Sequence, residues 1–251
     1  MPTRDDSSTR SWDGIADDWV AHADTNDYRN DFLLPRMLQL LGDVQGLSIL
    51  DLGCGEGGYS RELTRRGARV VGVDGSPRLI EVARQRTLAQ GLAIEYVRAN
   101  ASAMDDVAPT SFDRVVAAMS LMDVEDYEGA VSEVHRVLRP GGDLWMSLTH
   151  PCFSPPVSRW IRDEAGLLQF FSVDRYFDRT AWDSRIAPAF RDPVLRRHRP
   201  LEDYLGAPLR QGFLLRELRE PNPTAEELPK SARFERLTRI PYFLFLRWEK
   251  P

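Results

Sequence analysis

Residues 49–58 read ILDLGCGEGG, and this stretch decides the fold. The residues that lead into it, 47–51, form a short apolar run of the kind found in strands buried on both faces of a sheet. A cluster of glycines follows, and residues 58–66 have a helical pattern that ends at Gly67. A buried strand that turns tightly on glycine into a helix brings backbone N–H groups to the positive end of the helix dipole. The stretch therefore predicts a loop that holds a nucleotide-like ligand.

The alternation of strand and helix continues after this loop. Further strands are predicted at 69–73, 93–98, 112–118 and 143–149, with helices after Ser76-Pro77 and over 126–138. Strands separated by helix-length crossovers form a parallel, doubly wound sheet. Two last strands, 213–219 and 240–248, have no helical pattern between them, so we expect an antiparallel pair at one edge of an α/β sheet.

The chain is expected to form one domain over residues 1–251. Its predicted parts are an N-terminal helical cap (1–46), a core that carries the binding loop (47–149), an insertion that serves as a substrate lid (150–199), and a C-terminal helix with the strand pair (200–251). Within the cap, residues 12–22 read as a leading helix. Asn30 or Asp31 is the expected N-cap of a second helix.

Composition excludes several classes of protein. The net charge of −5 argues against a nucleic-acid partner, because nucleic-acid binding normally shows as a basic excess. Residues 1–10 are polar, unlike a signal peptide, and no apolar run is long enough to span a bilayer, so we expect a cytoplasmic protein without a membrane partner. Cys54 and Cys152 make neither a disulfide framework nor a zinc site, and no two histidines have metal-ligand spacing, so no metal is expected.

Polar residues end the first three predicted strands. Asp51 ends the first, Asp74 ends the second, and Asn100 follows the third. Ligands bind at the carboxyl ends of the strands in such sheets, and Asp74 stands where an acidic side chain accepts hydrogen bonds from both hydroxyls of a ribose. The glycines of residues 53–58 also fit the dinucleotide pattern G-x-G-x-x-G, which leaves a nicotinamide enzyme open at this point.

Five segments together resemble the class I S-adenosylmethionine-dependent methyltransferases, especially the bacterial ones that act on small molecules. In order they are 49–57 (ILDLGCGEG), 71–74 (VGVD), 100–101 (NA), 112–116 (FDRVV) and 138–142 (LRPGG). The resemblance implies a Rossmann-like, doubly wound sheet of seven strands with an antiparallel terminal strand. It also implies S-adenosyl-L-methionine as the cofactor, with S-adenosyl-L-homocysteine as its product.

The same resemblance implies which residues bind the cofactor. Asp51, Gly53, Cys54 and Gly55 would face its methionine part, Asp74 and Gly75 its ribose, and Asn100 and Ala101 its adenine. Ala118, at the end of strand four, completes the set with Tyr28 and Arg29, which lie in the segment that folds over the cofactor in similar proteins. Arg29 is the candidate for the methionine carboxylate, because a guanidinium can clamp a carboxylate with two hydrogen bonds. The family more often has aspartate where Asn100 stands, so here an amide oxygen would meet the adenine amino group.

The acceptor side of the reaction is predicted from residue 150 onward. His150 falls at the end of strand five and His198 precedes the C-terminal helix, so either is a candidate catalytic base. Eight of the 24 aromatic residues lie between His150 and Arg191, which predicts either a pocket wall or a small satellite core. We therefore expect methyl transfer to an oxygen or nitrogen atom of a small aromatic or heterocyclic metabolite, by a monomer or homodimer. The open alternatives are an RNA methyltransferase, an NAD(P)-dependent oxidoreductase, and a cofactor sensor without catalysis.

Overall fold

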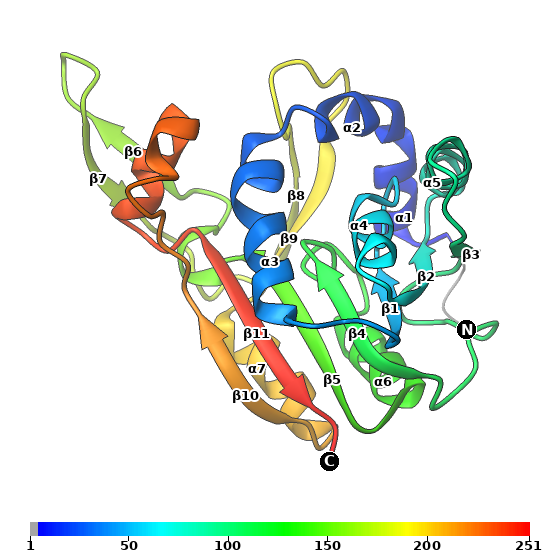
Figure 1. Ribbon diagram of the computed structural model, residues 1–251. Helices are drawn as coiled ribbons and strands as arrows, with labels where there is room; N and C mark the ends of the chain where they lie inside the picture. Colours follow the sequence, from blue (N-terminus) through cyan, green and yellow to red (C-terminus); the bar gives the residue numbers. More distant parts are fainter. Residues whose placement is uncertain (1–4) are drawn as a thin grey trace.

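The computed structural model describes residues 5–251 and is built around one seven-stranded sheet in the order β10-β11-β5-β4-β1-β2-β3 (Figure 1). The strands are β1 Ser48–Leu52, β2 Arg69–Asp74, β3 Glu95–Arg98, β4 Phe112–Ala118, β5 Leu138–Thr149, β10 Leu214–Arg219 and β11 Phe243–Glu249. Strands β1 to β5 pair in parallel, whereas β11 runs antiparallel to both β5 and β10. The predicted sheet and its antiparallel edge are confirmed.

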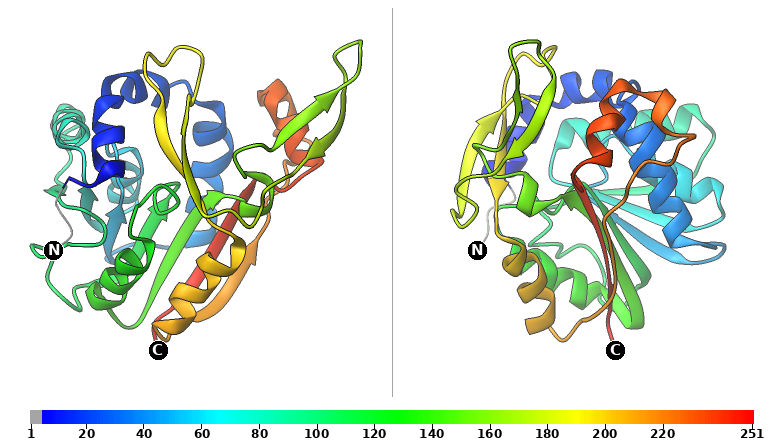
Figure 2. Two further views of the ribbon diagram at one scale, coloured as in Figure 1. Left: turned by 180° about the vertical axis from the view of Figure 1, so that it is seen from behind. Right: turned by 90° about the vertical axis from the view of Figure 1, so that its left-hand side faces the viewer.

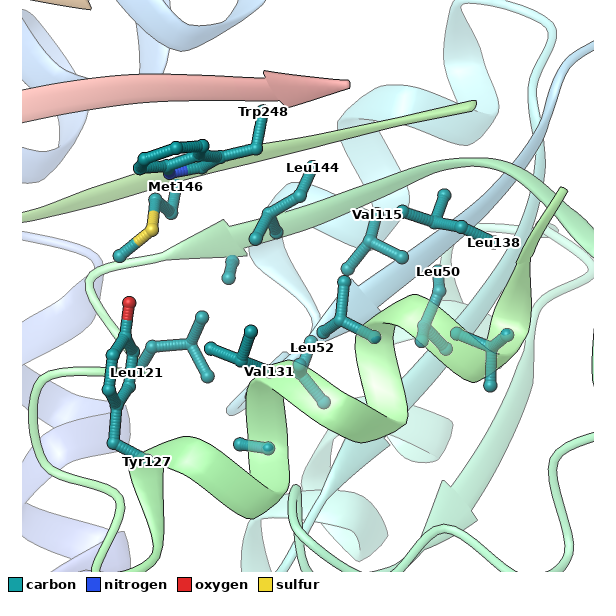
Figure 3. Packing of buried hydrophobic residues seen from close by; sticks show 14 of the residues in the cluster. Leu50, Leu52, Val115, Leu121, Tyr127, Val131, Leu138, Leu144, Met146 and Trp248 are labelled. Atoms are coloured by element: carbon teal, nitrogen blue, oxygen red, sulfur yellow. The ribbon is translucent and has the colours of Figure 1, made fainter. Parts of the chain in front are cut away.

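Helices cover both faces of this sheet. On one face lie α3 (Leu34–Leu41) and α4 (Gly58–Arg65), and on the other lie α6 (Tyr127–Val137) and α7 (Leu201–Arg210), as the right-hand view of Figure 2 shows. In Figure 3, Val131 of α6 and Leu50, Val115 and Leu144 of three strands point into the same core. The strands are buried on both faces, so their near-continuous apolar runs were readable from the sequence.

Two helix starts show where local sequence rules held and where they failed. Helix α5 (Pro77–Ala89) begins as predicted, since the Ser76 hydroxyl accepts a hydrogen bond from the Leu79 N–H at 3.0 Å. The second N-terminal helix is not capped by Asn30 or Asp31. Asp27 caps a wide turn, Tyr28–Leu33, in which the Leu34 N–H bonds to the carbonyl five residues back. Pro35 has no N–H to continue an ordinary α-helical ladder here, which accounts for the wide turn.

The predicted leading helix is two short helices, α1 (Ser7–Gly14) and α2 (Ala16–Ala23). Residues 1–4 of the expected cap lie outside the described part of the chain. Strand β5 begins before residue 143, because Leu138 already pairs with Phe112 and residues 139–142 run on in the strand. Among residues 5–251, no helix combines the length and apolar character that crossing a membrane requires.

The insertion after β5 folds into two antiparallel hairpins where the sequence shows no period. A short turn, Pro151–Phe153, leads to β6 (Arg159–Arg162) with β7 (Leu168–Ser172), and then to β8 (Thr180–Ser184) with β9 (Val194–His198). Strands β6, β7 and β8 have no fully buried residue, so the alternation that would reveal them is weak. Two short 3-10 segments, Leu228–Lys230 and Ala232–Thr238, follow later, between β10 and β11.

The two hairpins have different surroundings. The β8–β9 hairpin packs against the N-terminal helices through Ile15, Phe190 and Val194, and the Leu195 N–H donates to the Ser11 hydroxyl at 2.7 Å. These elements lie together over the carboxyl edge of the sheet, whereas β6–β7 projects away from it (Figures 1 and 2). We call α1, α2 and residues 180–198 the cover.

Candidate active site

A cavity of about 480 Å³ lies between the cover and the carboxyl ends of the strands. This volume is in the range of small-molecule sites. All eleven residues predicted to bind the cofactor line the cavity: Tyr28, Arg29, Asp51, Gly53, Cys54, Gly55, Asp74, Gly75, Asn100, Ala101 and Ala118. Residues scattered over ninety positions of sequence therefore meet on one surface.

Two glycines of the binding loop are required by close approaches. Gly53 has φ +71°, and a Cβ there would lie 2.3 Å from the Cβ of Ser120, on the turn after β4. The Ser120 hydroxyl in turn donates to the Leu52 carbonyl at 2.6 Å, which holds the two turns together. At Gly58, a Cβ would overlap the Arg29 guanidinium. Side chains at these positions would close the turn and displace Arg29.

Asp74 is held by the loop and keeps acceptor capacity. Its carboxylate accepts hydrogen bonds from the Gly55 N–H at 2.8 Å and from the Ser76 N–H at 2.9 Å, one to each oxygen. Burial raises the pKa of Asp74, and these backbone donors oppose that effect. Each oxygen retains a lone pair, so the group can accept from a pair of neighbouring hydroxyls.

Asp51 is a deeply buried carboxyl at the end of β1. Burial raises its pKa to about 7, the Ser60 hydroxyl that donates to it works against this, and the nearby negative charge of Asp74 adds to it. An anion in this position is stabilised by a cationic ligand group in the cavity. The Cys54 thiol beside it has a pKa raised well above its ordinary value by burial, so it is an inert part of the wall.

Arg29 belongs to a buried cluster of charges around Glu56. Arg29 lies 2.5 Å from one Glu56 oxygen, and Arg61 and Arg86 lie 2.7 Å and 3.2 Å from the other. Arg86 also pairs with Asp24 at 2.8 Å. Three guanidinium groups thus share two carboxylates, and of these five residues Arg29 and Glu56 line the cavity. The hydrogen bonds of Arg29 use three of its five N–H donors.

The expected role of the Asn100 amide oxygen does not fit the structure. That oxygen accepts hydrogen bonds from both the N–H and the hydroxyl of Ser102, each at 3.0 Å. Its two lone pairs are therefore occupied, and it cannot also accept from an adenine amino group. The amide NH₂ is the part of Asn100 that can meet a ligand, and it would bond to a ring nitrogen of adenine.

Neither histidine predicted as a base fits that role. Both ring nitrogens of His150 are engaged: Nδ1 accepts from the Cys152 N–H at 3.2 Å, and Nε2 lies 2.9 Å from Glu220. The His198 Nε2–H donates to the Tyr176 carbonyl at 2.7 Å. Both side chains are buried, and neither lines the cavity. Burial also lowers the pKa of His150, so its imidazole is a neutral, fully bonded part of the fold.

The aromatic residues of the insertion divide between its hairpins. Trp182 of β8 lines the cavity, whereas Trp160, Phe170 and Phe171 lie on β6–β7 and do not. The cavity receives further aromatic side chains from the N-terminal helices: Trp12, Trp19 and His22. The aromatic side chains of the cavity therefore come from several parts of the chain, including the N-terminal helices, where the sequence interpretation assigned only a leading helix.

The sequence analysis also missed Asp123 on the turn after β4. This carboxylate lines the cavity, is 3% exposed, and lies 3.5 Å from Nε of Arg196 on β9. The signal was its position five residues after Ala118, near the carboxyl end of strand four, where ligands bind in such sheets. Arg196 was hidden by the general abundance of arginine late in the chain.

These features define a class of protein: a doubly wound sheet whose first glycine turn and second-strand aspartate hold an adenosine-containing ligand. The residues that line the cavity are of the kinds needed to bind S-adenosylmethionine. At Gly55, which borders the cavity, a Cβ would meet only Trp19 within 4 Å, and Asp74 has capacity for ribose hydroxyls. Among residues 5–251, no cationic side chain pairs with Asp51, and the ligand's methionine part carries a cationic ammonium group.

Comparison with known proteins gives the family. Residues 50–146 match the model of the methyltransferase domain. The chain resembles an S-adenosylmethionine-dependent methyltransferase structure from Mesorhizobium loti (29% identity, 90% of this chain and 99% of that one, TM-score 0.72). A Listeria monocytogenes structure provisionally assigned to the same class is similar (25%, 87% and 95%, TM-score 0.71). Residues 50–146 therefore form a methyltransferase domain, and the chain as a whole is similar to solved structures of S-adenosylmethionine-dependent methyltransferases.

Among curated proteins, the chain is 42% identical over 109 residues to a ubiquinone biosynthesis O-methyltransferase from Methylocella silvestris. That match covers 43% of this chain and 42% of the relative. The chain matches between 40% and 58% of the length of such curated relatives. Each of these matches covers less than two thirds of this chain.

Proposed function

We propose that this protein transfers the methyl group of S-adenosylmethionine to an oxygen atom of a small, aromatic acceptor. The observation that carries the proposal is that residues suited to the cofactor and residues suited to an aromatic acceptor line the same cavity. One side is formed by the loop residues around Asp51 and Asp74, and the other by Trp12, Trp182 and Asp123. Oxygen is favoured over nitrogen because the named curated relatives with similar cofactor halves are O-methyltransferases.

The residues of the chain would act mainly by binding and orientation. The cofactor, when bound, supplies a methyl group on a positively charged sulfur, which is already a good leaving group. Holding an acceptor oxygen in line with such a group can supply roughly 7–11 kcal/mol of the acceleration in favourable systems. The tryptophans offer flat apolar surfaces for an aromatic ring, and the cover excludes water from the reacting atoms.

Binding of S-adenosylhomocysteine tests the cofactor half. Calorimetry should detect binding to the wild type, and Asp74→Ala should weaken it by roughly ten- to a hundredfold, as expected for lost charge-assisted hydrogen bonds. Asp113→Ala is the matched control, because Asp113 accepts from the Ser48 N–H at the opposite ends of the strands. An unchanged affinity in folded Asp74→Ala would refute the placement of the ribose.

Incubation with S-adenosylmethionine tests the acceptor half. Hydroxylated aromatic compounds should gain the mass of one CH₂ unit in the presence of the wild type. A gain confined to amines or thiols would contradict transfer to oxygen, and a lack of S-adenosylhomocysteine binding would contradict the whole proposal.

A further inference from the structure

The Asp123 carboxylate is buried without a hydrogen bond of ordinary length and angle, although the Trp12 indole N–H lies near enough to lower its pKa. Neither of its oxygens has a hydrogen-bond partner among the described residues, although the side chain is only 4% exposed. The nearest ion pair, with Arg196, is long at 3.5 Å. Buried carboxylates are normally bonded on both oxygens, so a group left in this state is costly and requires an explanation.

A buried carboxylate elsewhere in the chain shows the usual arrangement. Asp143, at the amino end of β5 and outside the cavity, is bonded to Arg114 at 2.6 Å and to Arg247 at 2.9 Å. It also lies 3.3 Å from the indole N–H of Trp145. Asp143 and Asp123 are buried to a similar extent. The Asp143 carboxylate is hydrogen-bonded on both oxygens, whereas the Asp123 carboxylate is not. This contrast separates a structural carboxylate from one that is kept open.

The backbone around Asp123 is fixed from several sides. The Arg199 guanidinium donates to the carbonyls of Met122, Val124 and Glu125. The Ser8 hydroxyl of the cover donates to the carbonyl of Asp123 itself. The chain therefore holds this residue in place through its main chain at the wall of the cavity, where its carboxylate oxygens are buried, an arrangement that preorganises a functional group.

The position of Asp123 relates it to the reacting centre. Its N–H bonds to the carbonyl of Ser120 at 3.1 Å, and Ser120 is the residue that contacts Gly53 in the binding loop. Asp123 thus lies one turn beyond the loop that would hold the methionine part of the cofactor. Trp12 and Trp182, the flat surfaces of the acceptor half, line the same cavity.

The charged groups that act on Asp123 come from β9 and the residue after it, Arg196, Arg197 and Arg199, and the titratable Tyr204 lies near it as well. Burial raises the pKa of Asp123, and the arginines together with the indole of Trp12 lower it again. The net direction is upward, toward the range in which a carboxylate can take a proton at neutral pH.

We propose that Asp123 is the proton acceptor for the hydroxyl group that this enzyme methylates, so that the substrate class is a hydroxyl compound bound in its un-ionised form. This inference rests on the proposed function. The O–H bond of the acceptor breaks and its proton moves to an Asp123 oxygen. The acceptor oxygen forms the bond to the methyl carbon, whose bond to sulfur breaks with its electron pair left on sulfur. The products are a methyl ether, a neutral thioether and a protonated Asp123.

Thermal unfolding of Asp123→Asn tests the inference without any acceptor. Because the folded-state pKa of Asp123 is raised, its stability contribution is present at low pH and is lost as pH rises through that pKa. Asp123→Asn has no charge to bury, so it should melt higher than the wild type at neutral pH, by roughly 2–4 °C. The difference should shrink toward pH 4. The matched variant Asp143→Asn should melt lower, because it breaks satisfied ion pairs.

Methylation of two probes gives the second readout. With phenol, Asp123→Asn should lose roughly 10²–10⁴-fold in kcat, as expected for a lost base. With 4-nitrophenol, which is ionised far more than phenol at neutral pH, the loss should be much smaller. Binding of S-adenosylhomocysteine should be unchanged in the variant.

Two results would overturn the inference while leaving the proposed function intact. In the first, Asp123→Asn and Arg196→Gln each lower the melting temperature by the same amount, and the double variant loses no more than either single one. The Asp123–Arg196 pair would then be a structural ion pair. The other is equal loss of rate with phenol and 4-nitrophenol. A wild type that does not bind S-adenosylhomocysteine would overturn the proposed function itself.

Discussion

Asp51 is the residue whose protonation should control cofactor affinity. Its pKa is raised to about 7 by burial, so at acidic pH the free protein carries a neutral carboxyl there. A ligand with an ammonium group binds the ionised form, so affinity for S-adenosylhomocysteine should increase as pH rises to about 7 and then level off. Calorimetry across this range measures it. Asp51→Asn should bind more weakly and lose the dependence, and a wild type with flat affinity would contradict the assignment.

His150 should matter for stability more than for turnover. Its ring bonds to the Cys152 N–H and to Glu220 and does not line the cavity. His150→Ala should therefore lower the melting temperature, since it leaves a buried N–H without its partner, while kcat of the folded fraction stays within about threefold of the wild type. Steady-state kinetics across pH checks this. A large kcat loss with an altered pH profile would restore His150 as a base.

At the scale of elements, the two hairpins of the insertion should respond differently to ligand. The β8–β9 hairpin packs on α1 and α2 around the cavity, whereas β6–β7 projects from the body and exposes Phe170. Hydrogen exchange with and without S-adenosylhomocysteine should show slower exchange in α1, α2 and β8–β9, with β6–β7 unchanged as the internal control. Equal protection of both hairpins would show that the insertion closes as one lid.

The sequence predicted the elements whose burial leaves a periodic trace. Strands β1 to β5 and the helices between them were located because each buries a continuous or one-sided apolar pattern. The hairpins were not, since short two-stranded ribbons with both faces partly exposed lack such a pattern. The wide turn before α3 depends on Pro35 in a particular tertiary setting, which local capping rules do not describe.

The same distinction holds for the site. Residues at strand ends, such as Asp51 and Asp74, could be placed because topology fixes one shared edge. The roles of His150 and Asp123 could not, because they depend on which partners a side chain finds after folding. Glu220 and Cys152 occupy the histidine, whereas among the described residues no hydrogen bond of ordinary geometry reaches the Asp123 carboxylate, whose ion pair with Arg196 is long at 3.5 Å.

At the scale of the whole molecule, α1 connects the two halves of the cavity. Its Asp13 accepts from the Ser76 hydroxyl and, at 3.1 Å, from the Arg78 N–H on the cofactor side. Its Ser7 accepts from Arg197 on the acceptor side. Asp13→Ala should therefore raise both the Kd for S-adenosylhomocysteine and the KM for acceptor, each by roughly three- to tenfold. Calorimetry and kinetics measure the two effects.

Asp17→Ala is the control, because the Asp17 carboxylate is 61% exposed and its pair with Arg78 contributes little. A change in the cofactor Kd alone, with the acceptor KM untouched, would show that the two sides of α1 act separately.

A single helix that contacts both ligand sites makes them thermodynamic partners. If the bound cofactor changes the affinity for the acceptor by some factor, the bound acceptor changes the affinity for the cofactor by the same factor, because the coupling free energy is the same in both directions. We expect the same helix to loosen when either product leaves, because its Ser8, Thr9 and Trp12 line the cavity. Methyl transfer would then be fast once both ligands are bound, and product release would be the rate-limiting step of turnover.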